Sequence, residues 1–458
     1  MRGRRLALGR GMKKSAGFGI LLASVASGLV ASASISACTA DSSSGSPDGG
    51  TADAQTFDAA VPDTATGTGP DAAGPDTAPP PADDAAPPPP PPPVDAGKDA
   101  ADAGVIVGCI PQEVSTRYDA TWLFGKGCRA DWNAANQVTF SLSNVVFTGF
   151  EGTIAAANAV TGQLFAASDG INLYDGTGTK TNTVPLGGNA SASQPVAFIG
   201  KPGSASDFYV LANAGAAGGT PPAGLFVTSL PCGQLTPAGA PTLVAGTESF
   251  TEALATVRHA NNVDRWVLGV APTGIATLAL TQSGFGAPAI TPWGGVIAGP
   301  AALQRAYIAF ARDRHTFAIT MENVGLVTGT FDNAAGAISN LKKIALPANT
   351  SLYSAAFSPD GTKLYASEWS GRYWQIDLGV LGGLDGGTDA GVAVTDLGAS
   401  GGALRLAIDD KLYLTTYAAT TLTVISNPNA PAAQLQTGTL NLPATCTATY
   451  GFPGIGDL

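Results

Sequence analysis

The sequence predicts an all-β protein: a seven-bladed β-propeller of four-stranded blades, preceded by a disordered linker rich in Pro, Ala and Asp. Three observations carry this prediction. A strand–turn–strand unit recurs six times at the spacing of propeller blades. The chain contains 59 Gly and only 12% charged residues, a composition typical of a turn-rich β protein. The segment from Thr39 to about Gly104 contains almost no bulky apolar residues.

The clearest copy of the unit is Tyr353 to Leu378, which reads YSAAFSPDGTKLYASEWSGRYWQIDL. Residues alternate around Phe357, and the sequence Ser-Pro-Asp-Gly that follows favours a tight turn. Asp360 can accept backbone amides within that turn, and Gly361 can adopt the positive φ that it needs. We expect three short strands joined by two turns.

Looser copies of this unit fill the rest of the chain after residue 150. Their second strands begin at an aromatic residue, and the steps between these residues are 44, 57, 51, 48 and 48. Third strands follow each copy, whereas fourth strands are weaker, for instance KTNTVPL at 180–186. The aromatic positions are Phe165, Tyr209, Trp266, Phe317, Tyr365 and Tyr413. These steps match a four-stranded blade and exceed the coils of a β-helix.

The two ends of this region, 121–144 and 444–456, are each too short for a blade. Together they predict a seventh blade closed by strands from both termini, which removes the free sheet edges. Six or eight blades remain the alternatives.

Four cysteines follow residue 38, and an even number in an exported chain favours two disulfides. Cys128 and Cys446 lie in the two halves of the closing blade, so we expect them to pair, leaving Cys109 with Cys232. The alternative is a metal site, but the spacings match no zinc pattern.

Residues 1–38 have the features of a bacterial lipoprotein signal peptide. Six Arg and Lys precede a short apolar stretch, and the tetrad Ile-Ser-Ala-Cys that ends at Cys38 resembles a lipobox. We expect lipidation of Cys38 and a lipid-anchored envelope location; an ordinary secretory signal or an uncleaved anchor is the alternative. Thr39 follows the cysteine, and lipoproteins with Asp at that place are often retained at the inner membrane. The outer membrane is therefore favoured.

Residues 39–108 form the predicted stalk, and 109–458 the propeller. The stalk cannot bury enough apolar surface to offset its ordering entropy, and its proline runs favour extended polyproline II. A proline-motif ligand is the alternative. The net charge of −11 is concentrated in this stalk, and the propeller region has no basic excess. We therefore expect no nucleic-acid partner, and we expect a monomer.

The order of the motifs TWLFGKG, EGTIAAANAVTGQLFAASDGINLYD, QPVAFIGKPGSASDFYVLAN, EALATVRHANNVDRWVLG and LYSAAFSPDGTKLYAS resembles a known family. It is similar to the N-terminal seven-bladed β-propellers of secreted, gliding-motility-associated bacterial surface proteins that bear PKD modules. The resemblance covers roughly 115–458, and Arg258 to Trp266 is its most specific part. This chain lacks the PKD and sorting domains and has the lipoprotein stalk instead. The resemblance implies a fold and an envelope location, and no defined activity.

Few residues suggest catalysis. The chain has two histidines: His259, interpreted as a hydrogen-bonded turn residue, and His315, expected to be exposed. No nucleophile elbow, phosphate loop or zinc-protease motif is present. Of the six tryptophans most should pack between blades, and Trp369, at a turn, is the exception most suited to ligand stacking.

One set of residues points to a binding site at a mouth of the central channel. The first strand of each blade runs beside the channel, so its opening residue should lie near one mouth. Arg405 falls one place later in its unit and joins the set less securely. The set is Glu151, Gln194, Glu252, Arg305 and Tyr353. Convergent polar groups of mixed charge indicate a small polar site, whereas solvated strand starts, with Arg305 paired to a nearby Glu, are the alternative.

We therefore expect a lipid-anchored binding or scaffold module for a protein or a small polar ligand. No catalytic residue, metal site or cofactor is predicted, although a cation at the channel mouth is possible. The alternative is a propeller-type enzyme, lactonase-like or quinoprotein-like, with a site at the central channel. Such an enzyme would need a convergent cluster of His, carboxylate and Arg side chains.

Overall fold

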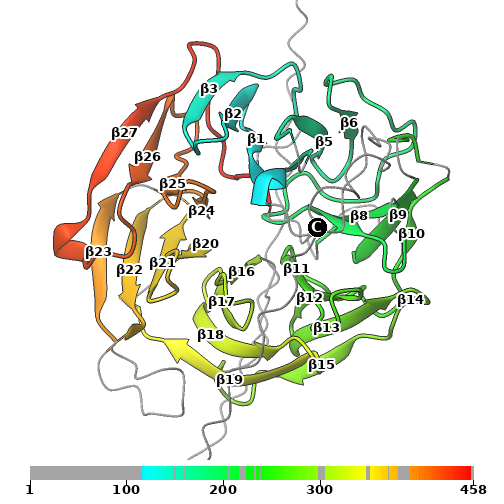
Figure 1. The fold of residues 1–458 in the computed structure, drawn as a ribbon. Helices are drawn as coiled ribbons and strands as arrows, with labels where there is room; N and C mark the ends of the chain where they lie inside the picture. Colours follow the sequence, from blue (N-terminus) through cyan, green and yellow to red (C-terminus); the bar gives the residue numbers. More distant parts are fainter. Residues whose placement is uncertain are drawn as a thin grey trace, which may run out of the picture. The chain divides into compact units, whose positions relative to one another are not determined.

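A computed structural model describes most of the chain after residue 115. The described residues are 116–147, 151–158, 161–204, 207–215, 223–231, 234–237, 239–297, 305–346, 351–369, 371–379, 392–399 and 401–454. Their strands form seven antiparallel sheets arranged in a ring around a central channel (Figure 1). The fold is therefore the predicted seven-bladed β-propeller. The predicted signal peptide and stalk, together with Cys38, Cys109 and Cys232, lie outside the described residues.

The blades follow one another in chain order. Blade 1 contains β4 (Ile154–Ala157), β5 (Leu164–Ser168) and β6 (Leu173–Asp175). Blade 2 contains β7 (Val196–Gly200), β8 (Phe208–Asn213), β9 (Leu225–Leu230) and β10 (Thr242–Leu243). Blade 3 contains β11 (Leu254–Arg258), β12 (Arg265–Ala271), β13 (Gly274–Thr281), β14 (Gly284–Phe285) and β15 (Ala289–Pro292), and both β14 and β15 pair with β13.

The remaining blades follow the same order. Blade 4 contains β16 (Ala306–Phe310), β17 (Thr316–Met321), β18 (Gly325–Asp332) and β19 (Ala337–Ile344). Blade 5 contains β20 (Leu352–Phe357), β21 (Lys363–Glu368), β22 (Arg372–Asp377) and β23 (Val394–Ala399). Blade 6 contains β24 (Leu404–Leu406), β25 (Leu412–Leu414), β26 (Thr421–Ile425) and β27 (Thr437–Asn441).

The first strand of each blade lies at the centre of the ring, beside the first strands of its neighbours (Figure 1). Strand β20 shows the consequence, because all six of its residues are buried. Neighbouring blades cover both of its faces, so the period-2 alternation of an exposed strand disappears. In the outer strand β19, by contrast, all residues but the last are exposed or only partly buried.

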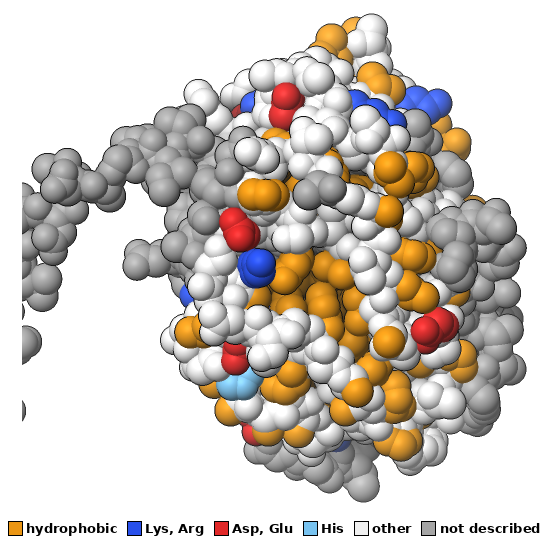
Figure 2. All heavy atoms as spheres, turned by 90° about the vertical axis from the view of Figure 1, so that its right-hand side faces the viewer, with side chains coloured by type: hydrophobic (Ala, Val, Ile, Leu, Met, Phe, Trp, Pro, Cys, Tyr) orange, Lys and Arg blue, Asp and Glu red, His pale blue; other side chains and the backbone are white. Residues whose placement is uncertain are grey.

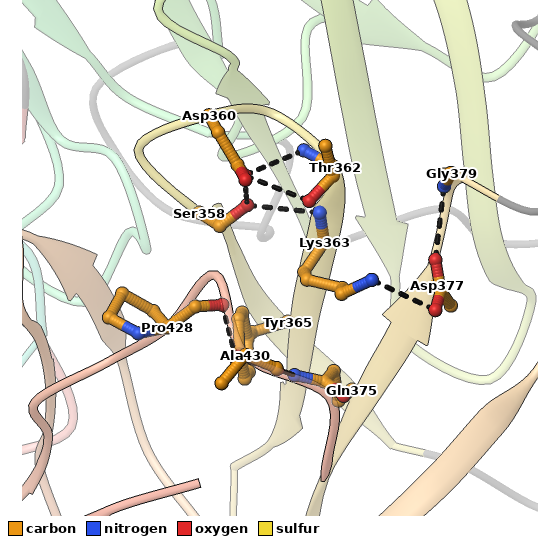
Figure 3. Close-up of polar contacts among 10 residues, drawn as sticks. All are labelled: Ser358, Asp360, Thr362, Lys363, Tyr365, Gln375, Asp377, Gly379, Pro428 and Ala430. Carbon is orange, nitrogen blue, oxygen red and sulfur yellow. Dashed lines mark hydrogen bonds and ion pairs between the residues drawn. The ribbon is translucent and has the colours of Figure 1, made fainter. Parts of the chain in front are cut away.

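The turn between β20 and β21 has the predicted chemistry (Figure 3). Asp360 Oδ1 accepts hydrogen bonds from the hydroxyls of Ser358, at 2.6 Å, and Thr362, at 2.9 Å, and from the amide of Thr362 at 3.0 Å. Gly361 has a φ of 72°, the left-handed conformation that glycine adopts without a steric penalty. Lys363 then pairs with Asp377 at 2.8 Å and connects β21 to β22.

The same unit is tied to blade 6 by buried polar groups (Figure 3). The Tyr365 hydroxyl donates to the Pro428 carbonyl at 2.7 Å, and Gln375 Nε2 donates to the Ala430 carbonyl at 2.8 Å. Gln375 also donates to the Tyr365 hydroxyl at 2.7 Å. These bonds satisfy polar atoms that the blade packing removes from water.

The closing blade joins both ends of the propeller. It consists of β1 (Thr121–Phe124), β2 (Cys128–Trp132) and β3 (Val138–Leu142), and residues 446–454 run along it. That C-terminal segment makes bridges at Lys126–Thr447 and Thr153–Pro453. The predicted disulfide is confirmed, since Cys128 and Cys446 are bonded with their Cα atoms 5.1 Å apart. The closing segment differs from the expectation of a regular strand. Within the described residues it makes isolated bridges, and it also makes backbone hydrogen bonds with Ala403, Ala418 and Ala419 of blade 6.

Aromatic side chains fill the junction between the closing blade and blade 6. The Trp122 ring lies 4.6 Å from Trp132, 5.7 Å from Tyr413 and 5.2 Å from Phe452. The buried Arg405 guanidinium stacks on Trp122 at 4.5 Å and pairs with Asp119 of the short helix η1 (Thr116–Asp119). These contacts, together with the disulfide, lock the ring at the point where its two ends meet.

The expected fourth strand of blade 1 is absent from the described part of that blade. The segment 180–186 makes one isolated bridge, Tyr174–Lys180, instead of a ladder. The Asn182 side chain explains the difference, because it accepts a bond from the Leu173 amide at 2.8 Å and donates to the Ile171 carbonyl at 2.9 Å. It thereby occupies backbone groups that a fourth strand would use.

The outer surface carries few charges on the side with β9, β10 and β14. Figure 2 shows hydrophobic side chains gathered in a hollow there, with isolated charged side chains around it. Tyr209 and Val227 of blade 2 and Phe285 of blade 3 are partly buried there and pack on the hydrophobic core between the two blades.

Within the described residues, no helix is both long and apolar enough to cross a bilayer.

Candidate functional site

The opening ends of the first strands gather around one mouth of the channel. In an antiparallel blade the turn between the second and third strands returns to the end at which the first strand starts. The register shows this in blade 5, where Leu352 pairs with Glu368, and in blade 6, where Leu404 pairs with Leu414. The mouth is therefore built from the strand starts together with these turns.

Glu151 lies at the mouth with only 7% of its surface exposed. Its Oε1 accepts a hydrogen bond from the Ser191 hydroxyl at 3.3 Å, and its Oε2 accepts a long one from the Tyr353 hydroxyl at 3.4 Å. Burial raises the pKa of Glu151 to about 7, against the opposing effect of the Arg305 charge.

Glu252 lies next to it and is 2% exposed. Its Oε2 accepts the Ser193 amide at 3.2 Å, and its other oxygen accepts no hydrogen bond from the described residues. Burial, reinforced by the charge of Glu151, raises the pKa of Glu252 to about 8. The two carboxyls thus converge on the loop that contains Ser191 and Ser193.

Arg305 stands at the rim and is paired with a nearby Glu, as the alternative interpretation of the strand starts predicted. Its Nη1 lies 3.2 Å from Glu322, which follows β17 in the same blade. The Arg305 side chain is about half exposed. Its charge acts on both Glu151 and Glu252, but its hydrogen bonds go to Glu322. The mouth therefore has three carboxyls close to one guanidinium.

Gln194 belongs to the same region, but its side chain holds strands together. Oε1 accepts the amides of Leu254 at 3.1 Å and Ile308 at 2.9 Å, and Nε2 donates to the Ile308 carbonyl at 3.0 Å. Gln194 thus joins β11 to β16, the first strands of two neighbouring blades. Both of its polar side-chain atoms therefore already have partners, which leaves Gln194 the member of the predicted set with the least capacity to bind a ligand.

A chamber of about 530 Å³ lies in the channel on the other side of Gln194. Its walls are mainly apolar residues of β11, β16, β20 and β24, among them Val257, Ile308 and Phe357. Arg405 lines it, as do Arg312 and Asp410, which pair with each other at 2.5 Å. Glu151, Glu252, Arg305 and Tyr353 are not among the described residues that line it, so the mouth and the chamber are separate features.

Sequence reasoning missed most of an aromatic surface at the mouth. Tyr450 of the C-terminal segment lies 6.3 Å from the Tyr353 ring, 5.7 Å from Trp369 and 4.5 Å from Tyr417, with which it is stacked. Trp369 and Tyr417 each follow the second strand of their blade, and are 37% and 49% exposed. Their place in the turns between second and third strands was the available signal.

The histidines lie elsewhere and have structural partners. His259 stacks on Trp266 at 5.4 Å, and its Nδ1 accepts the Asn261 amide at 3.0 Å, as expected of a turn residue. His315 is exposed in the turn before β17. Within the described ranges, no three His, Cys, Asp or Glu side chains are arranged to hold a metal ion.

Comparisons with known proteins extend the picture only to the fold. No family model and no curated protein matches the chain. A candidate 6-phosphogluconolactonase from Bacteroides uniformis is similar at 14% identity and a TM-score of 0.44, covering 70% of this chain and 96% of its own. A second from Bacteroides fragilis has 13% identity and a TM-score of 0.42, covering 74% and 99%.

A third similar structure was solved with a protein segment bound to it. Sqt1 of Chaetomium thermophilum, bound to the N-terminus of a ribosomal protein, has 15% identity and a TM-score of 0.36, covering 56% of this chain and 65% of its own. The resemblance to propellers of gliding-motility-associated surface proteins is confirmed only as far as the seven-bladed fold.

Proposed function

We propose that the chain is a lipid-anchored binding module of the bacterial envelope, and that its ligand occupies the channel mouth between Glu151 and Glu252. The ligand is a small polar molecule or a polar loop of a partner protein. The anchor is Cys38, and the stalk 39–108 holds the propeller away from the membrane. The order of its motifs resembles that of the propellers of secreted gliding-motility-associated proteins, and this resemblance supports the envelope location.

The observation that carries the proposal is the convergence of two buried carboxyls at an open end of the channel. Burying an acid is unfavourable unless it gains partners, and Glu252 has one oxygen that accepts no hydrogen bond from the described residues. Arg305, the cation nearest to both acids, is paired with Glu322. A bound polar group would supply the missing partner.

The test is a thermal-shift comparison of the full chain in detergent with its Glu252→Gln variant. The probes are Ca²⁺, N-acetyl-arginine amide and glucose, which represent inorganic cations, organic cations and neutral polyols. We expect at least one probe to raise the melting temperature of the wild type and to lose that effect in the variant.

Glu248→Gln is the matched control, because Glu248 is an exposed acid four residues earlier in the chain. It should respond to the probes as the wild type does. The site is refuted if no probe stabilises the wild type, or if the wild type and Glu252→Gln respond alike.

An enzyme is the second candidate, favoured by one observation. Two neighbouring carboxyls with pKa values of about 7 and 8 can exchange protons near neutral pH, as general acids and bases do. Hydrolysis of a sugar lactone by the wild type, lost in Glu252→Gln and kept in Glu248→Gln, would support this function. Equal rates in all three proteins would exclude these carboxyls as the catalysts of that reaction.

A further inference from the structure

The mouth has an exposed aromatic surface as well as its carboxyls. Trp369 and Tyr417 are 37% and 49% exposed, whereas the tryptophans Trp122, Trp132 and Trp374 are at most 2% exposed. Both exposed rings pack on Tyr450, and the Tyr417–Tyr450 pair is nearly parallel, with 14° between the ring planes. These two large side chains come from different blades and are both partly exposed to water at the same place. We therefore treat their exposure as a property of the mouth.

This aromatic surface is continuous with the carboxyl pair. The Tyr450 ring lies 6.3 Å from the Tyr353 ring, and the Tyr353 hydroxyl donates to Glu151 Oε2. Gly451 sits directly against the Glu151 backbone, so closely that an added Cβ would clash with it. The C-terminal segment therefore places Tyr450 between Glu151 and the two exposed rings.

When the buried carboxyl pair is deprotonated, the charges around this surface leave an excess of acid. Glu151, Glu252 and Glu322 are opposed by Arg305 alone among the groups that act on the two buried carboxyls. Arg305 makes its ion pair with Glu322. A cation would offset the charge of the carboxyl pair, and aromatic faces attract cations through the ring quadrupole.

We infer that the ligand of the channel mouth is an organic cation, a guanidinium or a primary ammonium, which binds at the Glu151–Glu252 pair beside the aromatic surface formed by Trp369, Tyr417 and Tyr450. This inference rests on the proposed function and specifies its ligand. A neutral sugar would gain no charge attraction from the deprotonated pair. An inorganic divalent cation keeps a shell of oxygen ligands around it, so it would gain little from the aromatic rings.

The cation could belong to a free small molecule or to an Arg or Lys side chain of a partner's loop. Both sources present the same group to the site. In a loop, however, neighbouring backbone would also contact the rim. Affinity for a short arginine peptide, relative to the single amino-acid derivative, therefore distinguishes them.

The experiment is calorimetric titration of the full chain in detergent with N-acetyl-arginine amide. The citrulline analogue is the matched neutral probe, because it has nearly the same shape and no charge. We expect the citrulline analogue to bind at least about tenfold more weakly. Trp369→Leu and Tyr417→Leu should each weaken arginine binding roughly 2- to 30-fold, the effect expected of a lost cation–π contact.

Ile290→Ala is the control variant, since Ile290 is an exposed apolar residue on the outer strand β15, 42% exposed. It should bind arginine amide as the wild type does. A peptide Gly-Gly-Arg-Gly-Gly that binds more tightly than arginine amide supports a partner's loop, and equal affinity supports a free small cation.

Equal affinity for the arginine and citrulline probes overturns the inference, as does arginine binding unchanged in both aromatic variants. The thermal-shift probes distinguish failure of this inference from failure of the proposed function. If Ca²⁺ or glucose stabilises the wild type through Glu252 while arginine amide does not bind, the site stands and the organic cation is wrong. If no probe depends on Glu252, the proposed site itself is wrong.

Discussion

Removal of the Cys128–Cys446 disulfide tests how the propeller is closed. The bond joins residues separated by 318 positions, so in the unfolded chain it closes a loop that spans nearly the whole propeller. The chain-entropy relation gives about 6 kcal/mol for a loop of this length, while the loss of native disulfides typically costs about 2–5 kcal/mol. We expect Cys128→Ala with Cys446→Ala to lower the free energy of unfolding by about 3–5 kcal/mol.

The assay is equilibrium unfolding in urea, followed by tryptophan fluorescence and circular dichroism so that coincident transitions can be checked. The reference chain carries Cys109→Ser and Cys232→Ser, which leaves Cys128–Cys446 as the bond under test in the propeller. Reduction of this reference chain should reproduce the loss seen in the double alanine variant, because it breaks the bond without removing the sulfur atoms.

The outcome that refutes the reasoning is a difference below about 1 kcal/mol between the oxidised and reduced reference chains. Peptide mapping that joins Cys128 of the native chain to a cysteine other than Cys446 would refute it more directly. Either result would mean that the aromatic cluster around Trp122 closes the ring without a covalent contribution.

Three further predictions concern the mouth, the channel and the anchor. Burial raises the pKa of Glu252 to about 8 from its usual 4.5, so between these pH values the folded chain keeps a proton there that the unfolded chain has released. The stability that this proton contributes is complete below about pH 4.5 and is lost as the pH rises through about 8. Glu252→Gln should therefore gain more than about 1 kcal/mol relative to the wild type between pH 5 and pH 9 in urea unfolding, and an equal difference at both pH values would contradict this. Gln194→Ala should cost about 2–4 kcal/mol in the same assay, because it leaves buried backbone groups of β11 and β16 without partners; a loss below about 0.5 kcal/mol would show that water replaces the side chain. Cys38→Ala should move the protein from the detergent phase to the aqueous phase or leave it unprocessed, and identical partitioning of mutant and wild type would rule out the lipid anchor.

Local sequence determined the repeating units because their turns depend on neighbouring residues. The Asp360 side chain, the positive φ of Gly361 and the hydroxyl of Thr362 act within five residues, so the pattern alone predicts that hairpin. The step between units then predicts the blades. Closure of the ring followed from the two incomplete ends, and with it the pairing of Cys128 and Cys446.

Local sequence was less successful where a side chain competes with the backbone for hydrogen bonds. Asn182 binds the backbone of Ile171 and Leu173, and this replaced an expected strand. Gln194 was placed correctly near the channel, but its amide group joins two strands of other blades. Neither outcome follows from a pattern of apolar and polar residues, because each depends on which backbone groups come within reach after folding.

The composition of the mouth was decided by tertiary structure in the same way. The alignment of strand starts predicted from sequence alone that Glu151, Glu252 and Tyr353 lie at one end of the channel, since every blade repeats the same geometry. Glu322, the partner of Arg305, lies opposite it in the same hairpin, where the repeat could have placed it. The stacking of Tyr417 on Tyr450 arises between segments that the repeat does not relate. Tyr450 reaches the mouth only because the C-terminal segment closes the ring, and burial by the assembled blades, rather than any neighbour in sequence, raises the pKa values of the two carboxyls.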